Sequence, residues 1–158
     1  MPVSRTPSGT RGAKMPPKAL LRALMPVMTF VHRRRGDRFR GGDLLYLTTV
    51  GARTGQRRHN PVGRYDDGQG GWLVVASFGG AAQHPGWYHN IVAHPDEVWA
   101  EVAGTTHHVR AEQLTGPDRE RAWAVITEQS SSFLGYEKST DRELPVLRLL
   151  PVAPGAET

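Results

Sequence analysis

Residues 51–58 read Gly-Ala-Arg-Thr-Gly-Gln-Arg-Arg and combine several groups that bind anions. The guanidinium groups of Arg53, Arg57 and Arg58 and the hydroxyl of Thr54 are donors suited to a phosphate or a carboxylate. The two glycines let the backbone turn sharply. The segment lacks the lysine and the following helix of a P-loop. It therefore predicts either an anion-binding loop or a solvated basic hairpin.

A second segment, residues 76–90, brings small residues close to aromatic ones. It reads Ala-Ser-Phe-Gly-Gly at 76–80 and then contains Trp87, Tyr88 and Asn90. Paired glycines after a strand allow backbone N–H groups to face a planar, polar ring system, and the aromatic pair could cover a substrate. The alternative is that Trp87 and Tyr88 belong to the hydrophobic core.

Short strands are expected to position both segments. Apolar and β-branched runs predict strands at 44–50, 59–65, 72–77, 98–102, 107–114 and 143–152, and helices at 17–35, 84–92 and 118–128. The 18 glycines and 12 prolines favour many turns over a helical bundle. The sequence therefore predicts an α+β fold, a small barrel of about six antiparallel strands with two to four helices.

The chain of 158 residues is near the usual size of one domain. Its composition predicts a flexible basic tail at 1–17, an N-terminal amphipathic helix and linker at 18–40, the barrel domain at 41–152 and a short tail at 153–158. The helix either packs its apolar side on the barrel or lies on an anionic membrane surface.

The net charge of +5 is concentrated before residue 64 and favours phosphate-bearing partners. A nucleic acid is not expected, because the basic region lacks interleaved aromatic residues that would stack on bases. The chain has no cysteine, and the spacing of its histidines predicts no metal site. No apolar stretch is long enough to span a membrane, so we expect a cytoplasmic protein that could be peripheral on the inner face of the cell membrane.

Residues 44–151 resemble the family of deazaflavin-dependent nitroreductases and quinone reductases of actinobacteria. The resemblance rests on TTVGARTGQRRHNP at 48–61, followed by VVASFGGAAQHPGWYHN at 74–90. Members have a split β-barrel fold, like FMN-binding oxidoreductases, and bind coenzyme F420, a hydride carrier with a phosphate and an oligoglutamate tail. The resemblance implies a reductase that transfers a hydride from reduced F420 to a quinone, an activated alkene or a nitro compound.

The resemblance also implies roles for individual residues. The phosphate and the adjoining tail would be held by Arg53, Thr54, Gln56 and Arg58. Asn60 and Pro61 would line the approach to the ring, which Ala76, Ser77, Gly79 and Gly80 would contact, while Trp87, Tyr88 and Asn90 would shape the far wall. Several members have lysine where this chain has Phe78, beside the phosphate, which implies weaker tail binding or compensation by Arg57.

In the nitroreductase members, the segment that matches 130–136 carries several tyrosines that close over the substrate. This chain retains Tyr136, with Phe133 and Ser130 at the other two places. The resemblance implies that Trp87, Phe133 and Tyr136 contact the substrate, and that Tyr136 or Ser77 supplies a proton. Tyr136 could instead be a surface residue at a helix end. The loss of hydroxyl groups favours an apolar acceptor over a nitroimidazole.

Two other functions fit the same residues. An FMN-binding oxidoreductase would keep the fold and exchange the cofactor. A non-catalytic protein that binds the deazaflavin or a lipid would account for the missing tyrosines. The sequence predicts neither the physiological acceptor nor the oligomeric state.

Overall fold

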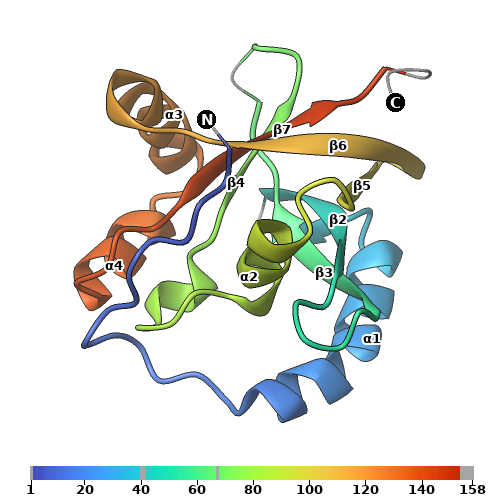
Figure 1. Cartoon of the computed structure of the whole chain (residues 1–158), viewed down its shortest axis with the longest axis horizontal. Helices are drawn as coiled ribbons and strands as arrows, with labels where there is room; N and C mark the ends of the chain where they lie inside the picture. Colours follow the sequence, from blue (N-terminus) through green and yellow to red (C-terminus); the bar gives the residue numbers. More distant parts are fainter. Residues whose placement is uncertain (1, 40–41, 67, 154–158) are drawn as a thin grey trace.

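A curled antiparallel sheet forms the body of the protein in the computed structural model (Figure 1). The structure describes residues 2–39, 42–66 and 68–153. In these residues the strands are β1 (Arg38–Phe39), β2 (Gly42–Val50), β3 (Arg57–Gly63), β4 (Trp72–Val75), β5 (Trp99–Val102), β6 (Thr105–Gln113) and β7 (Val146–Pro151). The helices are α1 (Lys18–Arg34), η1 (Phe78–Gly80), α2 (Gly86–Ala93), α3 (Gly116–Gln129) and α4 (Ser132–Ser139).

The strands are joined in the order β1-β2-β5-β6-β7-β4, with β3 paired to the other edge of β2. All these pairs are antiparallel, and Leu47 of β2 lies opposite both Asn60 of β3 and Ala100 of β5. Beyond β3, Tyr65 forms a bridge with Leu73 of β4, so the two ends of the strand order approach each other. The predicted α+β fold with a barrel-like antiparallel sheet is confirmed.

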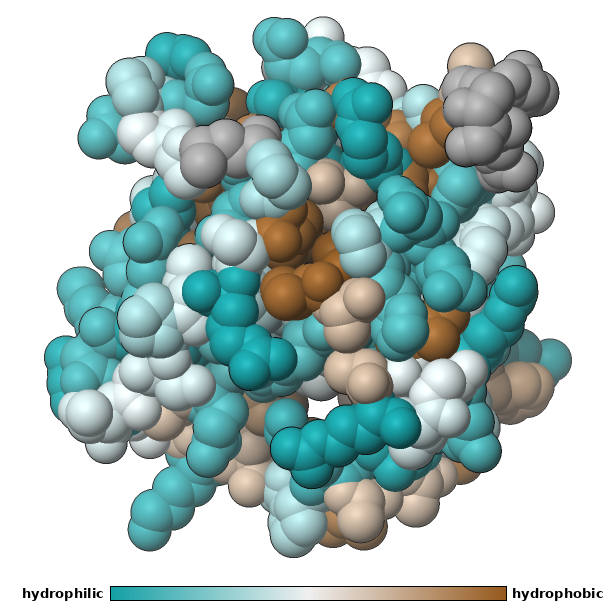
Figure 2. Space-filling view, in the orientation of Figure 1, coloured by the Kyte–Doolittle hydropathy of each residue, from teal (hydrophilic) through white to brown (hydrophobic). Residues whose placement is uncertain are grey.

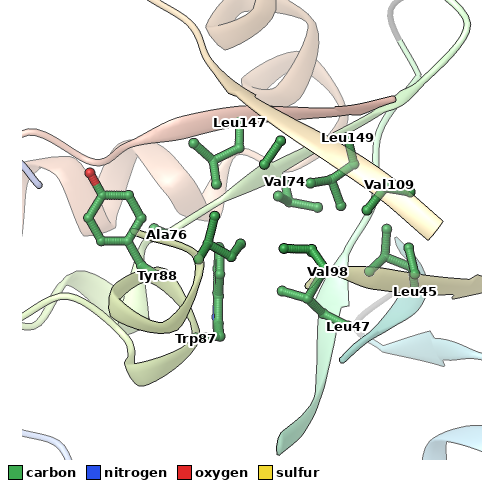
Figure 3. Packing of buried hydrophobic residues seen from close by; sticks show 13 residues of the cluster. Leu45, Leu47, Val74, Ala76, Trp87, Tyr88, Val98, Val109, Leu147 and Leu149 are labelled. Carbon is green, nitrogen blue, oxygen red and sulfur yellow. The ribbon is translucent and has the colours of Figure 1, made fainter. Parts of the chain in front are cut away.

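The main hydrophobic core lies inside the curled sheet, where α2 packs against it (Figure 3). Leu45 and Leu47 alternate along β2 and are fully buried, as are Val74 on β4 and Leu147 on β7. Strands with alternate side chains on one face bury that face when the sheet curls. The sheet is therefore a rigid support for the loops at its ends, including those that carry the two predicted binding segments.

A second buried cluster lies between the sheet and the C-terminal helices. Ala122 and Ile126 of α3 pack against Leu73, Leu144 and Val146. Phe133 and Tyr136 of α4 pack at the edge of this cluster. The sequence predicts α3 but not α4. Helix α4 has only eight residues and none of them is buried, so its sequence lacks the regular apolar spacing that marks a helix packed on a core.

The N-terminal segment lies against the body, although its composition predicts a flexible tail. The backbone N–H of Gly9 donates to the carbonyl of Ala82 at 2.8 Å. The backbone N–H of Thr10 donates to the carboxylate of Asp141 at 2.8 Å, and its hydroxyl donates to the same group. These partners are more than 70 residues away in the sequence, so composition alone does not reveal them. In Figure 1 the segment runs from the sheet past the η1 loop to the start of α1.

Helix α1 has two different apolar faces. Leu21 and Met25 line a cleft that separates the helix from the sheet. Leu20, Leu24 and Val27 are exposed, with 49, 45 and 61% of their surfaces accessible. The helix is therefore apolar on the side that faces the cleft and on an exposed side, and contact of the exposed side with a membrane stays a prediction. Among the described residues, no helix is both long enough and apolar enough to cross a membrane.

Some predicted segments fall partly outside the described residues. These are Met1 in the N-terminal tail, residues 40–41 in the linker and at the start of the barrel domain, Asp67 in the turn after β3, and 154–158 in the C-terminal tail.

Candidate functional site

One large cleft, with a volume of about 1710 Å³, lies between α1 and the sheet. Its described lining comes from α1, the β2–β3 loop, β3, the η1 loop and α2, so both predicted binding segments face the same space. Figure 2 shows the surface opened below α2, between the body and the segment that leads into α1. The predicted site residues in the lining are Arg53, Thr54, Arg57, Arg58, Asn60, Pro61, Ser77, Phe78, Gly79, Trp87, Asn90 and Phe133.

The β2–β3 loop is closed by its own backbone. Gly51 N–H donates to the carbonyl of Gln56 at 2.7 Å, and Gly55, at φ +69°, donates to the carbonyl of Gly51 at 2.9 Å. The hydroxyl of Thr54 accepts the N–H of Gln56 and occupies the space that a Cβ on Gly51 would need. This tight turn leaves the side chains of Arg53 and Thr54 on the cleft, while Gln56 is not part of the described lining.

Asn90 joins the β2–β3 loop to α2. Its Oδ1 accepts the backbone N–H of Ala52 at 3.0 Å, and its Nδ2 donates to the hydroxyl of Thr49 at 3.0 Å. The side chain is buried, with 9% of its surface accessible. The sequence predicts Asn90 as a wall of the cofactor pocket; in the structure its two polar atoms join α2 to the β2–β3 loop and to the end of β2.

The η1 loop has a left-handed backbone at three successive residues. Phe78, Gly79 and Gly80 have φ values of +44°, +61° and +82°. Such a conformation is strained for the non-glycine Phe78 and persists only where the surroundings enforce it. A Cβ on Gly80 would lie 2.9 Å from the backbone oxygen of Tyr136 on α4. The loop is therefore pressed against α4 on one side and faces the cleft on the other.

A buried arginine, Arg142, organises the η1 loop from behind. Its guanidinium donates to the carbonyls of Ala76 at 3.1 Å, Ser77 at 2.7 Å and Ala81 at 2.8 Å. Its Nη1 also lies 3.2 Å from Nδ1 of His84. Burial lowers the pKa of Arg142 and of His84. One charged guanidinium therefore binds three backbone carbonyls on the two sides of the η1 loop, and such charge-assisted hydrogen bonds hold the loop in position.

Trp87 and Tyr88 leave α2 in different directions (Figure 3). Trp87 is buried and contributes to the cleft lining. Tyr88 is fully buried in the core, and its hydroxyl donates to the carbonyl of Ser4 at 2.5 Å. Ala76 and Gly80 are also buried and, like Tyr88, absent from the described lining. The alternative of a core residue thus describes Tyr88, whereas Trp87 belongs to both core and cleft.

The late segment presents Phe133, rather than Tyr136, to the cleft. Phe133 is part of the lining, and Tyr136 packs edge-on against it with ring centroids 5.7 Å apart. Ser130 accepts a hydrogen bond from the hydroxyl of Tyr65 at 2.8 Å. Burial raises the pKa of Tyr65. This aromatic group therefore closes one end of the cleft with an apolar ring.

Elsewhere on the lining, two arginines already have partners within the protein. Arg33 of α1 forms an ion pair with Glu101 at 2.5 Å, and its guanidinium lies 4.1 Å from the ring centroid of Tyr46. Burial and a hydrogen bond to Asp37 raise the pKa of Tyr46 well above its usual value. Arg57 lies over the ring of Trp99, 4.4 Å from its centroid, so its cation is also engaged within the protein.

The lining also contains residues that the sequence analysis did not single out. They include Arg5 and Met15 from the N-terminal segment, Lys18 and Arg22 from α1, and His89 from α2. The only available signal was the basic amphipathic pattern of α1. The contacts that bring residues 2–17 to the body join residues far apart in the sequence, such as Thr10 and Asp141, and such pairings leave little trace in the sequence.

Comparisons with known proteins agree with this geometry. The model of the F420H(2)-dependent quinone reductase family matches residues 22–151. A Mycobacterium tuberculosis protein named F420H(2)-dependent quinone reductase is 36% identical over 134 residues, which cover 82% of this chain and 89% of that protein. A solved structure described as an F420-H2 dependent reductase (FDR-A) has a TM-score of 0.60 and 33% identity, over 67% of this chain and 92% of that one.

A more distant structure supports the fold alone. The heme storage protein HutZ of Vibrio cholerae has a TM-score of 0.50 at 16% identity, over 82% of this chain and 91% of that protein. The family model, in contrast, matches the sequence itself over residues 22–151, which include both segments that line the cleft. The chain therefore belongs to the F420H(2)-dependent quinone reductase family.

Proposed function

We propose that this protein binds reduced F420 in the cleft beside α1 and transfers a hydride to a quinone. The observation that carries the proposal is the joining of the two binding segments by Asn90, which places an arginine-rich turn and a glycine-rich loop on one cleft. Membership of the family supports F420 rather than FMN as the cofactor.

The residues of the cleft fit such a coenzyme. In the described structure Arg53 and Arg58 line the cleft without an ion-pair partner, as an anion-binding wall requires. The left-handed Gly79 removes side-chain bulk from the loop that would face a planar ring. We propose that Arg53, Thr54 and Arg58 hold the phosphate, while Ser77, Phe78 and Gly79 contact the ring.

Bound F420 in its reduced form supplies the hydride, from C5 of the deazaflavin, and the protein supplies position and a proton path. Trp87 and Phe133 offer apolar surfaces that would hold a quinone against the ring. A quinone that accepts a hydride would become the hydroquinone monoanion, which takes up one proton to give the neutral hydroquinone. The hydroxyl of Ser77 lines the cleft and is the proposed donor, with water as its source; Tyr136 would act through its packing on Phe133.

The cofactor assignment is tested by titrating the protein with F420 and, separately, with FMN, using the fluorescence of Trp87 and Trp99 in the cleft. We expect F420 to bind and Arg58→Ala to weaken it about tenfold, since a hydrogen bond to a charged group contributes about 1.5–3 kcal/mol. Arg110→Ala is the matched control, because Arg110 is exposed on β6 outside the described lining and pairs with Glu112. Binding of FMN alone would contradict the proposal.

We also propose that the protein is cytoplasmic and that its helix α1 rests on an anionic membrane. The exposed residues Leu20, Leu24, Val27 and Val31 share one side of α1, and arginines lie near them along the helix. An apolar face flanked by basic residues is complementary to an anionic lipid surface. Contact there would bring the cleft beside α1 close to a quinone dissolved in the membrane.

Sedimentation with vesicles that contain phosphatidylglycerol measures this contact. We expect the double variant Leu24→Glu, Val27→Glu to lose about tenfold or more of the vesicle affinity, because both side chains lie on the exposed side of α1 and would enter the interface. Leu134→Glu is the control, since Leu134 is 44% exposed on α4. If the double variant and the Leu134→Glu control lost vesicle affinity equally, or if the wild type did not sediment with vesicles, a membrane role for α1 would be rejected.

A further inference from the structure

Cations from three separate elements converge around His89 on the cleft wall. Arg5 belongs to the N-terminal segment, Lys18 begins α1 and Arg53 lies in the β2–β3 loop, and all three line the cleft. The pKa of His89 is lowered first by burial and then by the charges of Arg5 and Lys18, with smaller effects of His84 and Arg53. Nδ1 of His89 is buried and has no hydrogen-bond partner in the described residues.

This positive cluster differs from Arg33 on the same lining, which Glu101 neutralises. No ion pair involves Arg5, Lys18 or Arg53 within residues 2–39, 42–66 and 68–153. Like charges held together without a counter-charge repel one another, and a bound anion removes that repulsion. The cluster is thus arranged for a ligand with negative charge.

The η1 loop holds Lys18 in this cluster. Nζ of Lys18 lies 5.8 Å from the centroid of the Phe78 ring, within the range of a cation–π contact. Met15, three residues earlier, lies against Gly79, with its Sδ 3.2 Å from where a Cβ would be. The junction between the N-terminal segment and α1 therefore rests on the same loop that is proposed to contact the deazaflavin ring.

We propose that Arg5 and Lys18, which line the same cleft as Arg53, form a second anion subsite that binds the carboxylates of the F420 tail. The inference rests on the proposed F420 function and extends it: Arg53, Thr54 and Arg58 hold the phosphate, and the N-terminal segment with α1 supplies the wall for the glutamates. Through this subsite the N-terminal segment distinguishes the complete coenzyme from the same deazaflavin without its tail.

The experiment compares two ligands, F420 and a tail-less deazaflavin that keeps the phosphate but lacks the oligoglutamate. The full-length wild type, Lys18→Met, Arg5→Met and the double variant are titrated with each ligand by tryptophan fluorescence at low and high salt. We expect each single change to weaken F420 binding about fivefold, the upper range for one exposed charge pair, and the double change to weaken it more. Binding of the tail-less ligand should change less than about twofold. The loss should be greatest at low salt.

Lys14→Met is the matched control, because it removes one charge from an exposed residue of the same segment outside the described lining. Equal F420 affinity in the wild type and the double variant overturns the subsite, while the proposed function stands as long as the wild type binds F420. A loss of equal size for Lys14→Met, or for the tail-less ligand, also overturns it. Failure of the wild type to bind F420 at all rejects the proposed function itself.

Discussion

Replacing Arg142 by methionine is expected to lower the melting temperature by about 10 °C and to weaken F420 binding by about tenfold or more. Arg142 is 5% exposed, and three loop carbonyls, those of Ala76, Ser77 and Ala81, accept its hydrogen bonds. Methionine fills a similar volume but leaves these buried acceptors without their donor, at about 1 kcal/mol or more each. Thermal unfolding and F420 titration measure the two effects.

The opposing effect is the removal of a buried charge, which by itself would stabilise the protein. We expect the lost hydrogen bonds to dominate, because charge-assisted bonds to several carbonyls offset the burial of the guanidinium. Arg142→Lys keeps the charge but lacks the forked geometry, so an intermediate result is expected. Arg119→Met is a control: Arg119 also donates to a carbonyl, that of Leu144, but lies outside the described cleft lining. An Arg142→Met protein with unchanged F420 affinity would show that the guanidinium does not position the loop.

The sequence predicts the strands that pack through side chains and the turns between them. Residues 44–50 are predicted as a strand, and β2 covers Gly42–Val50; the helix predicted at 118–128 is α3, at Gly116–Gln129. Alternating burial and helix-start signals are local, so they appear in the sequence. The two family motifs also identify Arg53 and Ser77, which both line the cleft. Each motif is a short, unbroken stretch of sequence, so it can be found without the structure.

The parts that the sequence does not predict depend on contacts between distant backbone atoms or on isolated residues. Arg142 follows a polar turn and has no motif around it, yet it binds a loop more than 60 residues earlier. The N-terminal segment has the composition of a free tail, and its hydrogen bonds join it to Ala82 and Asp141, which lie more than 70 residues away in the sequence. Tyr88 adjoins Trp87 in a cofactor motif, but the direction of α2 turns it into the core.

The lysine that family members have at position 78 is a further case. For this chain the resemblance implies either weaker tail binding or compensation by Arg57. In the structure the guanidinium of Arg57 lies over Trp99, whereas Lys18, 60 residues before Phe78, lies near the phenyl ring. A helix that is distant in the sequence can supply a charge that the local motif lacks, and only the tertiary arrangement reveals it.

Gly80→Ala is expected to destabilise the protein by about 3 kcal/mol, and therefore to lower its melting temperature by roughly 10 °C. An L-residue at φ +82° costs about 1–2 kcal/mol, and the added Cβ would lie 2.9 Å from the backbone oxygen of Tyr136, which cannot move without shifting α4. Gly104→Ala separates these effects, because Gly104 has φ +83° and nothing within 4 Å of the added atom. Its loss should be only about 1–2 kcal/mol, with F420 affinity unchanged.

The contrast between these two glycines also tests how the cleft is built. If the η1 loop is held between Arg142 behind it and α4 beside it, a methyl group at Gly80 must displace the loop toward the cleft, and F420 affinity should fall together with stability. Thermal unfolding and F420 titration on both variants decide this. Equal destabilisation by Gly80→Ala and Gly104→Ala would mean that the backbone conformation alone is responsible. In that event α4 would not restrain the loop, and the position of the ring-binding residues would depend on Arg142 without support from the helix.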